Sequence, residues 1–339
     1  MASNGSPQRR ARLCQFFFEK RAQPPRFKSK HSGRQSFHCP QHCKVQFPDV
    51  GTKGHIVFPK IGPVKAILHR RFTGTVKTVT VVREASGKYY ASVLVDDAQP
   101  KVVPDTVNFE RTAGIDAGIK TAFTVASQGG TEKIDNPTFL KKYSEQLKKQ
   151  QKRLARCLRI VNVKENEKGE KVKEVTVSKR YEKVRKELVR THERIRHCRK
   201  NWIDQITHRL VNDSQVTTYV IEDLNLKGMV KNHHLARAVS DVGIGNFYRT
   251  LQYKLKAVGK NLIVAGRWYP SSKRCPECGA KKERLTLKER EWRCAQCGHE
   301  HDRDEAAARN LRHWVRLSES DKHRYGRNGR ALEKEAIPF

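Results

Sequence analysis

Acidic residues are scarce in this sequence. Its 339 residues include 35 Asp and Glu against 70 Lys and Arg, which gives a formal net charge of +35. A chain with such an excess repels itself unless a polyanion neutralises it, so we predict binding to DNA or RNA phosphates. An acidic membrane surface is the competing partner. It is less favoured because the sequence has no amphipathic anchor and no lipidation motif.

Long apolar runs are also missing. No segment approaches the ~18 apolar residues of a membrane span. The basic N-terminus has only Phe16–Phe18 as its apolar core, which is too short for the hydrophobic region of a signal peptide. Nine cysteines, four of them in CxxC pairs, fit a reducing compartment and a metal site better than disulfides. We therefore predict a cytoplasmic protein without a membrane partner.

Two CxxC pairs give the strongest metal signal in the chain. Cys275 and Cys278 are separated from Cys294 and Cys297 by fifteen residues, in the pattern C-x2-C-x15-C-x2-C. Each pair can form a tight knuckle with both sulfur atoms on one side, and four thiolates complete a tetrahedral shell. We predict a structural zinc ion, because no coordination position is left open for catalysis.

Other readings of these and the remaining cysteines are weaker. A redox role for the CxxC pairs is disfavoured, since the following Gly279 and Gly298 are typical of structural knuckles. We expect His299 and His301 to be exposed and not to act as ligands. A second zinc site at Phe37–Cys43 is disfavoured because no distant partner pair is visible, so its cysteines and histidines are expected to be incidental.

The first third of the chain predicts a small antiparallel β-barrel. Runs of β-branched and aromatic residues at Thr75–Arg83 and Lys88–Val95 flank a turn at Ala85–Gly87, which predicts a hairpin. Further strands are expected at His55–Phe58 and Val64–Leu68.

The following region predicts α/β structure. Two short strands are expected to meet near Gly118, and buried strands at 216–221 and 261–265. Segments 138–160 and 178–212 have helical periodicity and a charged link, which predicts a helical hairpin. Its Lys and Arg face is either solvated or part of a nucleic-acid groove, and the net charge favours the groove.

Three acids, Asp116, Glu222 and Asp304, lie in or beside apolar segments, where an unpaired charge is costly. Carboxylates suit Mg²⁺ or Mn²⁺, and two such ions can serve phosphodiester hydrolysis. Taken singly, each acid is better explained as a partner of one of the many cations. Spacing alone does not unite the three. Asp302 is expected to be a loop or helix-cap residue.

Several motifs go beyond spacing. The segments GIDAGIK (114–120), VIEDLNLKGM (220–229) and RWYPSSKRCPECG to RDEAAARNL (267–311) resemble the TnpB family. These proteins are transposon-encoded RNA-guided nucleases related to the compact type V CRISPR effectors. Segments 24–37 and 58–74 also resemble the wedge domain of that family.

The resemblance implies an RNase H-like (RuvC) nuclease domain with a split active site. Asp116, Glu222 and Asp304 would be its first, second and third acids and would bind two Mg²⁺ ions. The cysteine pairs would match a target-nucleic-acid-binding zinc ribbon inserted before the last acid. Such a site hydrolyses a DNA phosphodiester and leaves a 5′-phosphate, while a guide RNA selects the target by pairing. The expected partners are target DNA and guide RNA, in a prokaryotic nucleoid.

The expected domain order follows from the resemblance: an incomplete basic arm and wedge-like barrel at 1–110, the nuclease domain at 111–270 with the helical hairpin at 138–212 inserted, the zinc ribbon at 271–301, the last RuvC helix at 302–317 and a disordered tail at 318–339.

Two departures from the family pattern qualify the expected function. Ala306 stands where the family usually has Asn, which is expected to weaken positioning of the site. The family usually has a helical recognition lobe before the segment at 24–37, so we expect the chain to be truncated at its N-terminus. The alternative function is therefore a nucleic-acid-binding remnant or regulator that does not cleave. A conventional transposase ranks lower, because no tyrosine or DDE-type chemistry is evident.

Overall fold

The computed structural model describes residues 35–98, 100, 102–165, 171–286 and 289–325. The predicted basic arm lies almost wholly outside these residues. The chain divides into two compact units. The first comprises residues 1–100 and 185–190, and the second comprises residues 101–184 and 191–339.

The first unit contains two antiparallel sheets, each of three strands. The predicted hairpin is confirmed as β5 and β6, with Gly87 at φ 88° in the turn between them. The described strand pairs form two separate sheets and do not close a barrel. The strands are β1 (Gln35–Cys39), β5 (Thr75–Arg83) and β6 (Tyr89–Asp96) in one sheet, and β2 (Lys44–Gln46), β3 (Lys53–Phe58) and β4 (Gly62–Ile67) in the other.

Cys39 and Cys43 belong to the core of this unit. Cys43 is buried with Ile56, Phe58 and Val79, and Cys39 packs against them. Burial raises the pKa of the Cys43 thiol to about 11, so it is a neutral, apolar side chain at physiological pH. Within the described segments these cysteines are part of no group with metal-ligand geometry.

The second unit is built on a mixed five-stranded sheet in the order β13-β12-β7-β8-β9. The three strands β13, β12 and β7 run parallel, and β8 and β9 continue the sheet antiparallel. The predicted strand pair around Gly118 is confirmed as β7 and β8. The predicted buried strands are confirmed as β12 and β13. The bounds are β7 (Thr112–Ala117), β8 (Thr121–Ser127), β9 (Gly130–Asp135), β12 (Thr218–Glu222) and β13 (Asn261–Ala265).

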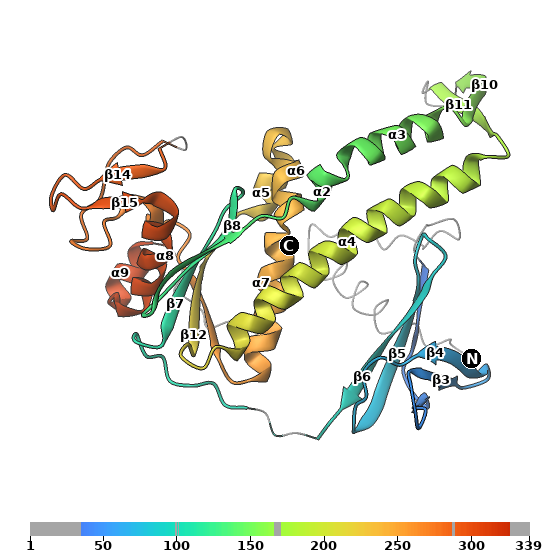
Figure 1. Cartoon of the computed structure of the whole chain (residues 1–339), viewed down its shortest axis with the longest axis horizontal. Coiled ribbons are helices and arrows are strands. Elements are labelled where there is room, and N and C mark those ends of the chain that lie inside the picture. Colours follow the sequence, from blue (N-terminus) through green and yellow to red (C-terminus); the bar gives the residue numbers. More distant parts are fainter. Residues whose placement is uncertain (1–34, 99, 101, 166–170, 287–288, 326–339) are drawn as a thin grey trace. The chain divides into compact units, whose positions relative to one another are not determined.

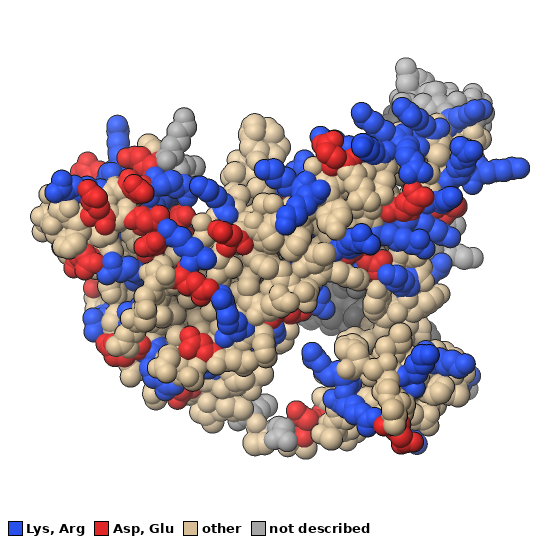
Figure 2. Space-filling view, in the orientation of Figure 1, with Lys and Arg blue, Asp and Glu red and all other residues tan. Residues whose placement is uncertain are grey.

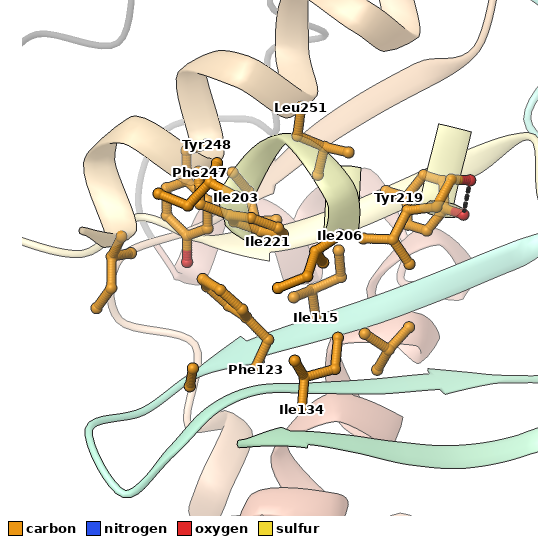
Figure 3. Packing of buried hydrophobic residues seen from close by; sticks show 14 of the residues in the cluster. Ile115, Phe123, Ile134, Ile203, Ile206, Tyr219, Ile221, Phe247, Tyr248 and Leu251 are labelled. Atoms are coloured by element: carbon orange, nitrogen blue, oxygen red, sulfur yellow. Dashed lines mark hydrogen bonds between the residues drawn. The ribbon is translucent and has the colours of Figure 1, made fainter. Parts of the chain in front are cut away.

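Helices cover both faces of this sheet (Figure 1). On one face, α4 (Tyr181–Asn212) and α7 (Ile244–Ala257) bury the main apolar core. Figure 3 shows side chains of β7, β8, β9 and β12 packed against side chains of these two helices, and Phe123 stacks on Phe247 with ring centroids 3.8 Å apart.

The other face of the sheet is covered by α8 (Arg303–His313). Val220 and Leu311 belong to a second buried cluster on this side. The helix lies very close to β7, because a Cβ atom on Gly114 would come 2.0 Å from the carbonyl oxygen of Ala308. Only glycine at position 114 allows this approach.

The predicted helical hairpin is partly wrong. Helices α2 (Phe139–Lys142), α3 (Ser144–Ala155) and α4 are present, but the first helical segment ends before residue 158. The chain then forms an antiparallel hairpin of β10 (Leu158–Glu165) and β11 (Lys171–Val177). The reason lies in the sequences LRIVNVKE and KVKEVTV, where β-branched residues alternate with polar ones.

The expected disordered tail is also wrong at its start. Helix α9 (Glu319–Arg324) is capped by the Ser318 side chain, which accepts a hydrogen bond from the Asp321 amide. Residues 326–339 lie outside the described part of the chain. The remaining helical elements are α5 (Leu226–Lys231), α6 (His233–Val242), η1 (Ser271–Lys273) and η2 (Trp314–Arg316). Among the described residues, no helix is both long and apolar enough to span a bilayer.

Candidate functional site

Asp116 and Glu222 lie at the carboxyl ends of neighbouring parallel strands. Ile115 of β7 pairs with Ile221 of β12, and each acid is the next residue on its strand. Both isoleucines face the core under α4 and α7, so the alternation of a strand directs both acids to the opposite face, which α8 covers. The two half-buried carboxylates are therefore neighbours on one face.

Asp304 is brought to the same face by the first turn of α8. The helix begins with Asp302, whose side chain accepts hydrogen bonds from the amides of Asp304 and Glu305 at 2.9 and 3.0 Å. The prediction that Asp302 is a cap residue is confirmed. Lys133 of β9 pairs with Asp302 and Glu305 at 3.0 and 2.8 Å, which ties the start of the helix to the edge of the sheet.

Asp116 lies in the electrostatic field of the other two acids. Burial, and then the charges of Glu222 and Asp304, hold the pKa of the Asp116 carboxyl well above its usual range. Burial also raises the pKa of Glu222, against the opposing effects of a Ser271 hydrogen bond and the Arg303 charge. Like charges brought together in a partly desolvated place favour either a shared proton or a bound cation.

Two further residues, which the sequence pattern did not indicate, hold these acids. The Ser271 hydroxyl donates to the Glu222 carboxylate, and Arg290 pairs with Asp304 at 3.2 Å. The oxygens of the three acids do not all lie within 4.8 Å of one another. Nothing in the local sequence signals the contact of Ser271 with Glu222 or that of Arg290 with Asp304. Ser271 is brought to Glu222 by η1, and Arg290 is brought to Asp304 by the ribbon.

The loop after β13 is clamped to α8. The Tyr269 hydroxyl donates to the Asn310 carbonyl at 3.0 Å, and the buried Asn310 amide donates to the carbonyls of Ser271 and Arg274, both at 2.7 Å. These bonds join the carboxyl edge of the sheet, the start of the ribbon and α8 into one rigid region. A cavity of about 360 Å³, lined in part by Glu222 and Ser271, opens at this edge.

The four cysteines meet as the spacing predicted. The sulfur atoms of Cys275, Cys278, Cys294 and Cys297 all lie within 4.8 Å of one another. Two of the Sγ–Sγ distances, Cys275–Cys297 and Cys278–Cys294, are 3.6 Å. Four sulfurs about 2.3 Å from a central Zn²⁺ form a tetrahedron with edges of about 3.8 Å. The donor set and its size therefore fit zinc.

Each knuckle is closed by backbone geometry. Gly279 and Gly298 have φ of 78° and 74°, a conformation that favours glycine, and their amides donate to the carbonyls of Cys275 and Cys294 at 2.9 Å. The amides of Cys297 and Gln296 lower the pKa of the Cys294 thiol to about 6. A knuckle that stabilises thiolate is suited to metal binding.

His301 does not lie where the sequence suggested. Its side chain is only 7% exposed, its Nε2 atom lies 3.1 Å from the Cys275 sulfur, and its ring packs on Trp292. The expected exposure was wrong, because Trp292 and His301 pair across β14 (Glu291–Arg293) and β15 (Glu300–Asp302). Ala306 is buried in the same cluster as Trp292, where its methyl group packs beneath the cysteines.

Two protein families match separate parts of the chain. The model described as "Probable transposase" (OrfB_IS605) matches residues 91–233, which include Asp116 and Glu222. The model described as "Cas12f1-like, TNB domain" matches residues 245–311, which include the four cysteines and Asp304.

Individual relatives agree with these matches. A "Putative RNA-guided DNA endonuclease" of Streptomyces pristinaespiralis is 34% identical over 87% of this chain and 66% of its own length. The "Putative RNA-guided DNA endonuclease InsQ" of Escherichia coli K12 is 27% identical over 87% of this chain and 69% of its own length. A "TnpB-like protein L79" of Acanthamoeba polyphaga mimivirus is 27% identical over 79% of this chain. The chain spans 48% of that viral protein and about two thirds of the two bacterial ones.

A solved structure supports the fold. Cas12f1, in a complex with sgRNA and target DNA, superposes with a TM-score of 0.55 over 88% of this chain and 68% of its own, at 15% sequence identity. At that identity the likeness concerns the fold alone. The two family models and the relatives in bacteria and a virus show that this chain belongs to the TnpB family.

Proposed function

We propose that this chain is the RNA-guided DNA endonuclease of a transposon and that Asp116, Glu222 and Asp304 form its catalytic centre. The observation that carries the proposal is the placement of Asp116 and Glu222 at paired positions on adjacent parallel strands, with Asp304 on the helix that covers the same face. Ligands of open α/β sheets gather at the carboxyl ends of the strands.

The donor chemistry of the centre fits two Mg²⁺ ions. The three carboxylates supply hard oxygen ligands. Burial, and then the charges of Glu222 and Asp304, raise the pKa of Asp116, and a bound divalent cation would offset both effects. When bound, such ions supply charge stabilisation at the attacking water and at the leaving oxygen of a phosphodiester. The Ser271 hydroxyl orients Glu222, and Arg290 neutralises Asp304 in the absence of cations.

The cysteine cluster has a structural role in this proposal. Zinc held by Cys275, Cys278, Cys294 and Cys297 fixes the segment that leads directly into Asp302 and α8. The ribbon thereby sets the position of Asp304 relative to the sheet. It also carries Arg290 to the acid centre.

Basic surfaces supply contacts to guide RNA and target DNA. Figure 2 shows Lys and Arg side chains gathered where Figure 1 places α3 and α4. Regularly spaced cations on helices contact phosphates without reading sequence, which suits recognition of a guide–target duplex by its backbone. The exposed cations are Lys148, Lys149, Lys152, Arg153 and Arg156 on or next to α3, and Lys183, Lys186, Arg190, Arg194, Arg196 and Lys200 on α4.

Cleavage by the ribonucleoprotein tests the proposal. The protein is purified with the RNA that accompanies it, and DNA containing a sequence complementary to that RNA is incubated with the complex and Mg²⁺. We expect cutting that leaves 5′-phosphates. Asp116→Asn, which keeps size and removes charge, is expected to lower the rate by more than ~100-fold, since even residues outside the first ligand shell commonly cost 10–100-fold.

The matched control is Glu145→Gln, which removes an exposed carboxylate whose ion-pair partner among the described residues is its helix neighbour Lys148. This variant is expected to cut at the wild-type rate, and all three proteins are expected to retain the same RNA. Cutting by Asp116→Asn at the wild-type rate would refute the assignment of the centre. If the wild-type protein binds RNA and DNA but does not cut, the alternative function applies: a nucleic-acid-binding protein that does not cleave.

A further inference from the structure

A tryptophan projects from the wall of the cavity beside Glu222. Trp268 is 74% exposed, whereas Trp292 and Trp314 are 5% and 1% exposed. The cavity of about 360 Å³ is lined by Trp268 together with Glu222 and Ser271. We propose that this cavity binds one nucleotide of a single-stranded nucleic acid, with its base stacked on Trp268.

The exposure of Trp268 is imposed by a rigid backbone. Its amide donates to the Tyr325 carbonyl at 3.1 Å, and the next residue, Tyr269, is buried against Trp314 and Tyr325 in edge-to-face contacts. Because Tyr269 points inward and is hydrogen-bonded to Asn310, its neighbour Trp268 is held outward. An aromatic platform held in this way loses little entropy when a base stacks on it.

Cations lie on the same wall. Lys273 and Lys281 line the cavity, and neither pairs with a carboxylate within the described ranges of the chain. Arg267 also lines the cavity and pairs with Asp223 at 2.9 Å, so its charge is already partly neutralised. Two uncompensated ammonium groups beside an aromatic face provide the combination that binds single strands: stacking for the base and positive charge for the phosphate.

The position of the cavity gives the bound nucleotide a role. Because Glu222 lines both the cavity and the acid centre, a nucleotide on Trp268 lies next to the bond that would be cut. This part of the inference rests on the proposed function. Binding itself does not, because neither a guide nor a catalytic metal is needed for a base to stack.

Tryptophan fluorescence tests the inference apart from cleavage. The full-length protein is titrated with a twelve-residue oligothymidylate, without added Mg²⁺ so that no cutting occurs. We expect saturable quenching of the wild-type protein, and Trp268→Leu is expected to abolish it. By anisotropy of labelled DNA, this variant is expected to bind about 5- to 160-fold more weakly, the range for one lost base–aromatic stack. Trp268→Phe is expected to retain most of the affinity, measured by anisotropy of labelled DNA. Lys281→Gln is expected to lower the affinity and to make the affinity less dependent on salt concentration.

The controls separate stacking from general attraction. Tyr89→Leu removes another highly exposed aromatic side chain, which belongs to the first unit, and is expected to leave the quenching unchanged. An oligouridylate that quenches more strongly would assign the nucleotide to RNA, and a stronger effect of oligothymidylate would assign it to DNA. Either supports the cavity. Quenching that persists in Trp268→Leu, is absent from the wild type, or is matched by a duplex of equal length would overturn it.

Discussion

Cys294→Ser is expected to abolish zinc binding and to unfold the ribbon, while the five-stranded sheet remains folded. The buried core of the ribbon is small: Cys275, Trp292 and Cys294, packed on Ala306 of α8. The metal must therefore supply most of the stability of the ribbon. Structural Zn²⁺ sites contribute on the order of 10–16 kcal/mol of apparent binding free energy in small domains. Loss of one thiolate from a tetrahedral site removes most of this contribution.

Atomic absorption measures the zinc content of the variant, and hydrogen exchange measures whether the ribbon is folded. The variant should contain no zinc, and amides of residues 291–302 should lose protection while those of β7 and β12 keep it. Cys198→Ser is the matched control, because Cys198 is a half-buried cysteine of α4 outside the cluster. It should retain one zinc ion per chain. A Cys294→Ser protein that also retains one zinc and a protected ribbon would contradict the assignment of the site.

Gly114→Ala is expected to destabilise the second unit by about 3 kcal/mol or more. The added methyl group would lie 2.0 Å from the Ala308 carbonyl oxygen and 2.4 Å from the Arg312 amide. Both are backbone atoms of α8 and cannot rotate away, so either the helix must shift or the strand must bend. Overpacking of a well-ordered contact costs 1–3 kcal/mol and occasionally more, and here the obstruction is backbone.

Urea unfolding gives the change in free energy, and the cleavage assay gives its consequence, because α8 carries Asp304. Gly129→Ala is the control: a Cβ there would meet only the Ser127 hydroxyl, at 3.8 Å, and the glycine has no positive φ. Its free energy of unfolding should change by less than about 0.5 kcal/mol. Equal stability of the Gly114 and Gly129 variants would show that α8 does not lie on β7 as described.

The cysteine cluster could be predicted from the sequence because its information is local. The two CxxC pairs specify both knuckles, and the four sulfurs meet as their spacing implied. His301 could not be placed in the same way. Its burial depends on pairing of β15 with β14 and on the ring of Trp292, which a spacing rule does not contain.

The acids show the opposite case. Asp116, Glu222 and Asp304 are far apart in the chain, and only the resemblance to a family suggested that they belong together. The fold supplies the physical link, since strand pairing sets the register of Asp116 and Glu222 and α8 brings Asp304 to the same face. The contacts of Ser271 and Arg290 with these acids depend on tertiary placement, so no local pattern could have revealed them.

Local polarity misled two predictions. The sequence predicts a charged link at 161–177 after a helix that ends at 160. The alternation of β-branched and polar residues instead forms β10 and β11. The polar tail was expected to be disordered, yet Tyr325 packs with Tyr269 and Trp314 at the end of α9. In both cases the polar composition suggested a solvated segment. The alternation of β-branched and polar residues stabilises the β10–β11 hairpin, and the aromatic contacts of Tyr325 stabilise the end of α9.

The central claim is that Asp116, Glu222 and Asp304 form one divalent-metal centre, separate from the zinc ribbon. An anomalous-difference map from crystals of the protein grown with Mn²⁺, which takes the same oxygen ligands as Mg²⁺, tests it most directly. We predict two manganese peaks within coordination distance of the three carboxylates, and a zinc peak among the four cysteines. Manganese bound elsewhere, with these three acids still paired to Ser271 and Arg290 or to other protein groups, would contradict the claim.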